Sequence, residues 1–174
     1  SPRIPSFSRG AGLDRLWAPW RSVYVTGAAG GKGCLFCGLL ADDDDRGNLI
    51  LARGPLVSAV MNRYPYTNGH LMILPNRHVA LFSELSPEEG AAMLAGAAAA
   101  ERAFSEAMNA GGINGGWNVG RCAGAGVEGH LHLHMLPRWP GDVNFMTSVM
   151  DTRVVSESLE SSYERLKPFF EGVF

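Results

Sequence analysis

The sequence predicts an α+β domain built on an antiparallel sheet of about five strands, with one long helix and a C-terminal helix. Three observations support this prediction. Short apolar runs are separated by turn-forming residues, a single long alanine-rich run carries helix-start signals, and strands and helices do not alternate as they would in a parallel sheet. With 174 residues, the chain is long enough for one hydrophobic core and too short to expect two.

Five short segments have the composition of strands. They are residues 48–52, 56–61, 70–75, 116–120 and 130–136. The second and third segments are separated by NRYPYTNG, whose Pro, Asn and Gly are typical of a turn. We therefore expect the first three segments to form an antiparallel meander.

Two helices are predicted, one long and one C-terminal. Residues 86–89 (SPEE) provide an N-cap serine, a proline at the first helical position and a glutamate at the third, which together form a capping box. The alanine-rich run that follows extends to about residue 110, where Gly111-Gly112 is expected to end the helix. A second, more polar helix is expected from about Thr152 to Lys167, stopped by Pro168.

The composition is that of an ordinary soluble globular protein, with 46% hydrophobic and 18% charged residues. A net charge of −2 argues against a nucleic acid polymer as partner. No apolar run approaches the roughly 20 residues needed to span a bilayer, which argues against a membrane protein. With only three cysteines, a disulfide framework is not expected, and we expect a cytoplasmic location.

Two further segments have an unusual composition. Residues 16–24, LWAPWRSVY, concentrate aromatic side chains that are costly to leave in water, so this part of the N-terminus is expected to dock on the body or on a partner subunit. Residues 42–45 are four consecutive aspartates, which we interpret as a solvated turn rather than a metal site.

Three of the five histidines lie at alternate positions of the last predicted strand, at His130, His132 and His134. Side chains of a strand alternate between its two faces, so the imidazoles share one face while the intervening Leu and Met residues face the core. This arrangement is compatible with a polar strand face, with a metal site, or with nucleophilic catalysis by the central imidazole, which is largely neutral near pH 7.

Cys34 and Cys37 form a C-x-x-C motif with no second cysteine pair to complete a four-cysteine site. A thioredoxin-like redox motif belongs in a βαβ setting, which the chain lacks, and a pair of free buried thiols is a further alternative. If the motif binds zinc, two more ligands must come from His70, His78 or the triad. A closed structural Cys₂His₂ site is the favoured interpretation.

The residues GHLHLHMLP (129–137) resemble the signature of the histidine triad (HIT) superfamily, whose members transfer or hydrolyse nucleotidyl groups. MNRYPYTNGHLMILPNRH (61–78) resembles the nucleotide-pocket hairpin of this family, and CLFC (34–37) is similar to its zinc-containing C-x-x-C branch. LWAPWRSVY (16–24) and PRWPGDVNFM (137–146) resemble the branch that includes diadenosine polyphosphate phosphorylases.

This resemblance implies a HIT-like fold and a division of the chain into three parts. They are an N-terminal arm over residues 1–33, a HIT domain with a zinc knuckle over residues 34–140, and a C-terminal extension with a helix over residues 141–174.

The resemblance also assigns roles to the triad. It implies that His132 is the nucleophile, which attacks the α-phosphorus to form a nucleotidyl-histidine. The main-chain carbonyl of His130 would hold the proton on the other ring nitrogen of His132, and His134 would donate to a phosphate oxygen or to the leaving group.

Metal and nucleotide ligands are implied in the same way. The implied structural zinc ligands are Cys34, Cys37, His78 and His130. The implied nucleotide-binding residues are Asn62, His70, Asn118, Gly124 and Gly126, together with His132 and His134. The glycine-rich loop 120–126 can bring backbone N–H groups close to phosphate oxygens. Gly126 stands where many hydrolase and phosphoramidase members carry glutamine, which favours the phosphorylase-like branch.

The implied activity is that of an enzyme, a nucleotidyltransferase or hydrolase that cleaves a dinucleoside polyphosphate, such as diadenosine tetraphosphate (Ap4A), at the α-phosphate. Alternatives are a HIT hydrolase or phosphoramidase, a metal-assisted hydrolase with the triad as ligands, and a nucleotide-binding module without turnover. Because family members are typically dimers, a homodimer or homotetramer is expected.

Overall fold

The computed structural model describes residues 33–143, residue 147 and residues 156–174. Its α-helices are α2 (Leu35–Ala41), α3 (Pro87–Met108) and α5 (Leu159–Leu166). Its strands are β1 (Ile50–Arg53), β2 (Val57–Met61), β3 (Leu71–Pro75), β4 (Gly112–Gly116) and β5 (Leu133–Arg138). Three 3₁₀ turns are η1 (Phe82–Glu84), η2 (Arg121–Ala123) and η3 (Lys167–Phe170). The predicted aromatic segment 16–24 lies outside the described residues.

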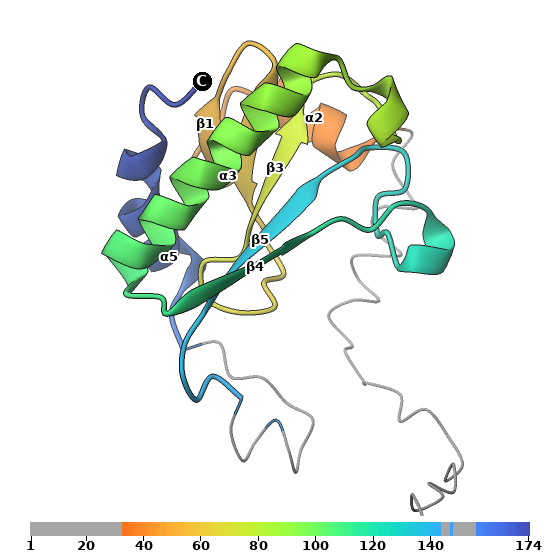
Figure 1. Cartoon of the computed structure of the whole chain (residues 1–174). Helices are drawn as coiled ribbons and strands as arrows, with labels where there is room; N and C mark the ends of the chain where they lie inside the picture. Colours follow the sequence, from red (N-terminus) through yellow and green to blue (C-terminus); the bar gives the residue numbers. More distant parts are fainter. Residues whose placement is uncertain (1–32, 144–146, 148–155) are drawn as a thin grey trace, which may run out of the picture.

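The five strands form one antiparallel sheet in the order β1-β2-β3-β5-β4, which confirms the predicted fold class (Figure 1). The first three strands are the predicted meander. Strand β5 is inserted between β3 and β4, and its register places His134 opposite Met72 on one side and Gly116 on the other. The histidine strand is therefore an interior strand with a neighbour on each side.

Helix α3 begins as the sequence predicts. The Ser86 hydroxyl accepts a hydrogen bond from the backbone N–H of Glu89, and the Glu89 carboxylate accepts one from the backbone N–H of Ser86. Its buried residues recur every three or four positions: Glu89, Met93, Gly96, Ala99, Ala100, Ala103, Phe104 and Met108. The helix ends at Met108 rather than near residue 110, because Asn109 adopts a left-handed conformation with φ 51°.

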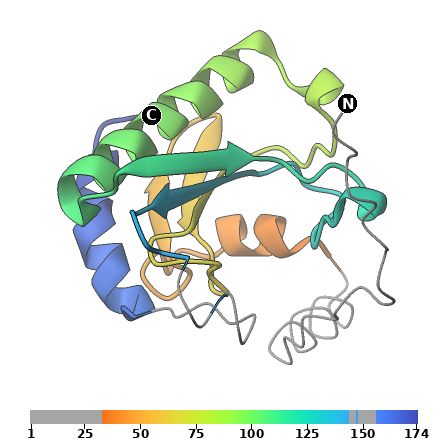
Figure 2. The same ribbon diagram turned by 60° about the horizontal axis from the view of Figure 1, so that its bottom comes forward.

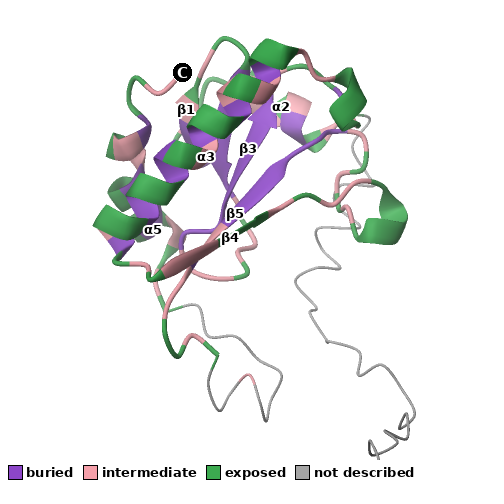
Figure 3. Cartoon of the chain, viewed as in Figure 1, coloured by how far each residue is buried: buried purple, intermediate pink, exposed green. Residues whose placement is uncertain are grey.

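The two faces of the sheet are covered differently. Helix α3, α5 and η3 pack on one face around the main core, which includes Ile73, Phe104 and Leu133. A smaller cluster that includes Phe36 and Val60 lies on the opposite face, beneath α2. Figure 2 shows α2 and α3 on opposite sides of the sheet, and Figure 3 shows the buried stripe of α3 against buried strands.

Two predicted strands are displaced in the structure. The predicted strand 116–120 is wrong, because the paired segment is Gly112–Gly116 and the chain then leaves the sheet toward η2. The GINGG sequence of β4 has little intrinsic strand preference, and its conformation depends on pairing with β5.

Strand β5 begins at Leu133, three residues later than predicted. In the register of β3 and β5, the next residues to pair would be Leu74 and His132, and this pairing needs the N–H of Leu131 to donate to the carbonyl of Pro75. The N–H of Leu131 instead donates to the carbonyl of Val79, at 2.7 Å, and the Pro75 carbonyl accepts from Nε2 of His130. His130 and His132 therefore lie just before the strand, with His130 in a bend.

The C-terminal helix is shorter than predicted. Helix α5 begins after Ser158, whose hydroxyl caps the N–H of Ser161, and residues 156–158 are not helical. Pro168 does not end the helical path but lies in the first turn of η3, where its missing N–H is tolerated. The Tyr163 hydroxyl donates to the carbonyl of Ile50, which ties this extension to β1.

Within the described residues, no helix combines the length and apolar character needed to cross a membrane. The division into arm, HIT domain and extension stays a prediction.

Candidate active site and metal centre

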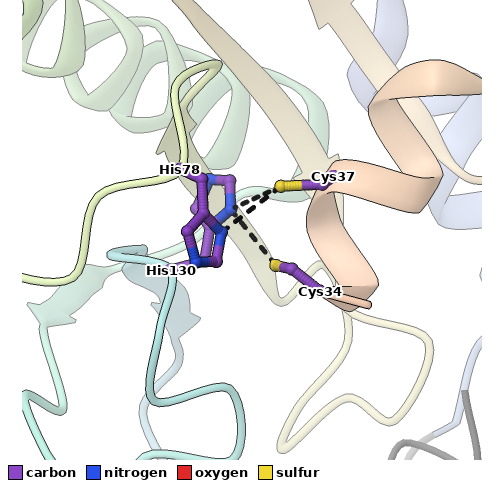
Figure 4. A group of neighbouring side chains, drawn as sticks. All are labelled: Cys34, Cys37, His78 and His130. Atoms are coloured by element: carbon purple, nitrogen blue, oxygen red, sulfur yellow. Dashed lines mark hydrogen bonds between the residues drawn. The ribbon is translucent and has the colours of Figure 1, made fainter. Parts of the chain in front are cut away.

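The structure brings together the four residues expected to bind zinc. Their ligand atoms all lie within 4.8 Å of one another (Figure 4). The Sγ atom of Cys34 lies 3.4 Å from Nδ1 of His130, and Sγ of Cys37 lies 3.4 Å from Nδ1 of His78 and 3.6 Å from Nδ1 of His130. In a tetrahedral site with Zn–S bonds of about 2.3 Å and Zn–N bonds of about 2.0 Å, sulfur and nitrogen lie about 3.5 Å apart. The arrangement therefore fits a closed Cys₂His₂ site.

The second ring nitrogen of His130 supports this arrangement. Its Nε2 lies 2.8 Å from the carbonyl oxygen of Pro75, the last residue of β3. Because a carbonyl can only accept, Nε2 carries the proton and Nδ1 has a free lone pair directed at the cysteines. This tautomer is the one that a metal ligand requires.

His78 is held by its neighbour Arg77. The Arg77 guanidinium makes two hydrogen bonds of 2.7 Å to the buried carboxylate of Glu89, in the first turn of α3. Gly129 provides room beside the His78 ring, since a Cβ at residue 129 would lie 3.3 Å from Cε1 and Nε2 of that ring. The metal centre is thus attached to β3, α3 and the histidine segment.

Burial, with a smaller contribution from Cys34, raises the pKa of the Cys37 thiol. A cysteine must lose its proton to bind zinc, so a bound cation would reverse this preference. The two cysteines are free, and both lie beside imidazoles rather than in a βαβ setting, which argues against the thioredoxin-like alternative.

His132 lies two residues after the metal-site residue His130, and one of its ring nitrogens is hydrogen-bonded to the backbone. Its Nδ1 lies 2.8 Å from the carbonyl oxygen of His130, so the Nδ1–H donates a hydrogen bond to that oxygen and Nε2 keeps a free lone pair. Burial lowers the pKa of His132, while the hydrogen bond to His130 opposes this shift. The result is a neutral imidazole with an unprotonated Nε2, which is the form of a nucleophile.

His134 is part of a chain of hydrogen bonds that starts at a backbone amide. The N–H of Tyr66 donates to Nδ1 of His70, at 3.2 Å. Neutral His70 therefore carries its proton on Nε2, which lies 2.9 Å from Nδ1 of His134. His134 accepts at Nδ1 and carries its own proton on Nε2, which is positioned to donate a hydrogen bond to a substrate oxygen.

Both imidazoles of this pair are neutral at physiological pH. Burial, with a smaller contribution from His134 and His132, lowers the pKa of His70 to about 3. Burial and the neighbouring His132 lower the pKa of His134 to about 4. His70 is fully buried behind His134, so it acts on the site through that residue and does not line the pocket.

A pocket opens beside His132 and His134. Of the residues predicted to bind nucleotide, Asn62, Asn118, Gly124 and Gly126 line it together with these two histidines. The sequence analysis missed four lining residues: Tyr64, Tyr66, Met72 and Val127. The first two belong to the NRYPYTNGH segment that suggested the pocket, whereas nothing local marks Met72 or Val127.

Helix α2 was not predicted, and it contributes a side chain to the site. Phe36 lies between the two cysteines in the sequence, and its side chain is buried. Its ring centroid lies 4.9 Å from that of His132 and 5.4 Å from that of His130. The C-x-x-C motif thus supplies both the sulfur ligands and an apolar wall for the central imidazole.

The glycine-rich loop closes one side of the pocket. Gly120 and Gly124 have φ values of 81° and 85°, which a side chain would disfavour. Arg121 forms an exposed ion pair with Glu128 at 2.8 Å and does not line the pocket. Cys122 is exposed on η2.

The sequence of the chain is similar to those of known proteins. Residues 47–141 match the sequence model of the HIT domain. A protein of Mycobacterium tuberculosis named AP-4-A phosphorylase is 36% identical over 168 residues, which cover 90% of this chain and 86% of that protein.

Solved structures agree with this match. A zinc-bound histidine triad family protein from Mycobacterium smegmatis has a TM-score of 0.66 and 27% identity, with 80% of this chain and 94% of that chain covered. A hypothetical histidine triad nucleotide-binding protein from Sulfolobus tokodaii has a TM-score of 0.64 and 24% identity over 79% of this chain and 92% of its own, which shows the fold alone. The chain belongs to the HIT domain family.

Proposed function

We propose that this protein is a nucleotidyltransferase or hydrolase that cleaves a dinucleoside polyphosphate, in the manner of an Ap4A phosphorylase. The observation that carries the proposal is the state of His132. Its Nδ1 is held by the His130 carbonyl, so that Nε2 keeps its lone pair, and the residue lines a pocket together with His134, whose ring centroid lies 4.8 Å from its own. The similarity to the M. tuberculosis AP-4-A phosphorylase supports the choice of substrate class.

In the first step, Nε2 of His132 attacks the α-phosphorus of the substrate and forms an N–P bond. The bridging P–O bond breaks and its electron pair leaves with the departing oxygen, to which the Nε2–H of neutral His134 donates a hydrogen bond. For Ap4A this leaves AMP on His132 and releases ATP. Backbone N–H groups of the glycine-rich loop are suited to receive the phosphate oxygens, since negative charge must be met by fixed donors.

In the second step, an acceptor attacks the same phosphorus and the N–P bond breaks. The electron pair of the N–P bond returns to Nε2 of His132, which frees the imidazole, and the proton of the attacking oxygen passes to water. Inorganic phosphate as acceptor yields ADP, whereas water yields AMP. Gly126 in place of the glutamine of many hydrolase members favours phosphate as acceptor.

We also propose that Cys34, Cys37, His78 and His130 hold a structural zinc ion. The M. smegmatis relative is described as zinc-bound, and the four ligand atoms here have the spacing of a tetrahedral site. When bound, such an ion would complete its coordination with protein ligands alone and leave no open position for a substrate.

Metal-assisted hydrolysis by the triad is the first alternative. Against it, the three imidazoles face different partners: His130 faces the cysteines, His132 a carbonyl and His134 the ring of His70. Among the residues that the structure describes, Cys34, Cys37, His78 and His130 form the cluster able to hold a metal. A nucleotide-binding module without turnover is the second alternative. It would bind the nucleotide in the same pocket as the proposed enzyme and would not cleave it.

The decisive experiment is chromatography of the products formed from Ap4A, with and without inorganic phosphate, by the wild type and by His132→Ala. We expect ADP and ATP only in the presence of phosphate, and no products from the variant. Ser105→Ala, on the exposed face of α3, is the matched control and should keep full activity.

Each other outcome changes the proposal in a defined way. AMP and ATP without phosphate would make the protein a hydrolase. Turnover by His132→Ala, or loss of turnover on chelation with no nucleotide on His132 by mass spectrometry, would support metal-assisted hydrolysis. Tight nucleotide binding without turnover would support the binding module.

A further inference from the structure

Helix α2 carries the zinc cysteines, yet little of its own sequence stabilises it. It has seven residues, its N-cap Cys34 makes no side-chain capping bond, and its last turn contains no basic residue. Isolated helices shorter than about 12 residues are marginal in water because nucleation is costly. The helix therefore depends on contacts with the rest of the protein at both of its ends.

At its C-terminal end, that contact comes from Arg53, the last residue of β1. One guanidinium nitrogen lies 2.6 Å from the carbonyl oxygen of Leu40, and the other lies 2.5 Å from that of Asp42 and 3.5 Å from that of Leu39. The last carbonyls of a helix have no partner within the helix and carry partial negative charge. Arg53 satisfies several of them at once and brings a positive charge to this end.

The four-aspartate run is organised around the same guanidinium. Asp45 accepts a hydrogen bond of 2.6 Å from Nε of Arg53. Asp42 is the C-cap of α2, a position where a carboxylate is unfavourable beside the helix dipole. The run is thus an exposed turn, as predicted, and Arg53 supplies the counter-charge that lets it follow the helix directly.

We propose that Arg53 is a positioning residue for the metal centre. By docking the C-terminal end of α2 onto β1, it places Cys34 and Cys37 opposite the histidine ligands before a metal binds. The same docking holds Phe36 against the His132 ring. A metal then binds to ligands that are already ordered, so less ordering entropy is lost on binding. The inference rests on the proposed zinc site, which the zinc content of the wild type tests separately.

The test is the zinc affinity of the full-length protein, measured by competition with a chromophoric chelator. Arg53→Met keeps the aliphatic stem and removes the guanidinium, and we expect zinc affinity to fall by about 10-fold or more. Arg53→Lys keeps the charge without the fork and should give an intermediate loss. Amide hydrogen exchange should accelerate in residues 35–41 of both variants and remain unchanged in α3.

Tyr163→Phe is the matched control, because it removes a hydrogen bond to Ile50 of the same strand without touching α2. Its zinc affinity should equal that of the wild type. Wild-type affinity and wild-type exchange in Arg53→Lys would overturn the proposal, even if Arg53→Met did not fold. An equal loss of affinity in Tyr163→Phe would also overturn it, since a general weakening of β1 would then explain the effect.

Discussion

At the scale of single residues, the site is organised by the two nitrogens of each imidazole. His130 uses one nitrogen toward the cysteines and the other toward Pro75, and its own carbonyl holds Nδ1 of His132. A second chain runs from the Tyr66 amide through His70 to His134. Each chain begins at a group whose role as donor or acceptor cannot change, so the tautomer of every member follows from it.

The pair of variants His70→Asn and His70→Gln tests the second chain. The Asn side chain can still accept from the Tyr66 amide but is too short to donate to His134, whereas the longer Gln can reach His134. We expect kcat to fall by on the order of 10²-fold in His70→Asn and by much less in His70→Gln, with little change in KM. Equal activity of the two variants in steady-state kinetics would contradict this assignment.

The lowered pKa of His70 also predicts how stability depends on pH. The pKa is about 3 in the folded protein, against about 6.5 without these contacts, so between these values only the unfolded chain binds this proton. The free energy of unfolding should therefore decrease as the pH falls below about 6.5.

Urea unfolding of the wild type and of His70→Gln from pH 7 to pH 5 measures this contribution. The variant has lost the titrating group, so its slope near pH 5 should be smaller by about 1.4 kcal/mol per pH unit. The zinc ligands are common to both proteins and cancel in the difference. Parallel curves would show that His70 titrates normally.

At the scale of elements, α3 and α2 illustrate two ways of stabilising a helix. Helix α3 has 22 residues, a capping box and a continuous buried stripe, so much of its stability can be read from its sequence. Helix α2 has seven residues and depends on buried Phe36, on Arg53 and on the proposed zinc ion. This difference explains why the first was predicted and the second was missed.

The capping box of α3 gives a stability prediction. Ser86→Ala removes the acceptor for the Glu89 amide and should lower the free energy of unfolding by about 1 kcal/mol. Ser105→Ala, on the exposed face of the same helix, is the control and should change it by less than about 0.5 kcal/mol. Urea denaturation of both variants measures the difference, and equal midpoints would contradict it.

Loss of a zinc ligand gives the corresponding prediction for α2. Cys37→Ala should contain less than one equivalent of zinc by elemental analysis and should have a lower Tm, because metal binding is coupled to ordering of the site. Cys122→Ala, which removes the exposed cysteine of η2, should keep both zinc and Tm. Stoichiometric zinc in Cys37→Ala would exclude the proposed ligand set.

At the scale of the whole molecule, the main hydrophobic core and the metal centre lie on opposite faces of the sheet. The face covered by α3, α5 and η3 holds the main core, and the other face holds α2 and the metal centre. Strand β5 serves both, because Leu133 and Met135 enter the core while His134 lies on the opposite face. The C-terminal extension adds Leu166 and Phe170 to the core side.

The outer edge of the sheet leads to a prediction about assembly. Within the described residues, β4 pairs only with β5, so its other edge is available for pairing with another chain. This edge is consistent with the expectation of a homodimer or homotetramer. Light scattering at micromolar concentration should give two or four times the 18.7 kDa of one chain. A mass of one chain would contradict the expectation.

The sequence by itself determined the features that depend on neighbours along the chain. Short apolar runs separated by turn residues, the capping box of the alanine-rich run and the lack of regular alternation between strands and helices were sufficient to predict the fold class. The resemblance to the HIT superfamily identified the four metal-site residues, which the structure then brought together.

Only the tertiary structure decided the contacts between distant segments. The ring of His70 meets that of His134 across 64 positions of sequence, and Cys34 meets His130 across 96. The start of β5 follows from the hydrogen bond between the Leu131 N–H and the Val79 carbonyl, and the last carbonyls of α2 accept hydrogen bonds from Arg53 of β1. Such contacts arise from packing and backbone hydrogen bonding across the sheet, because those forces act between atoms close in space, whatever their separation along the chain.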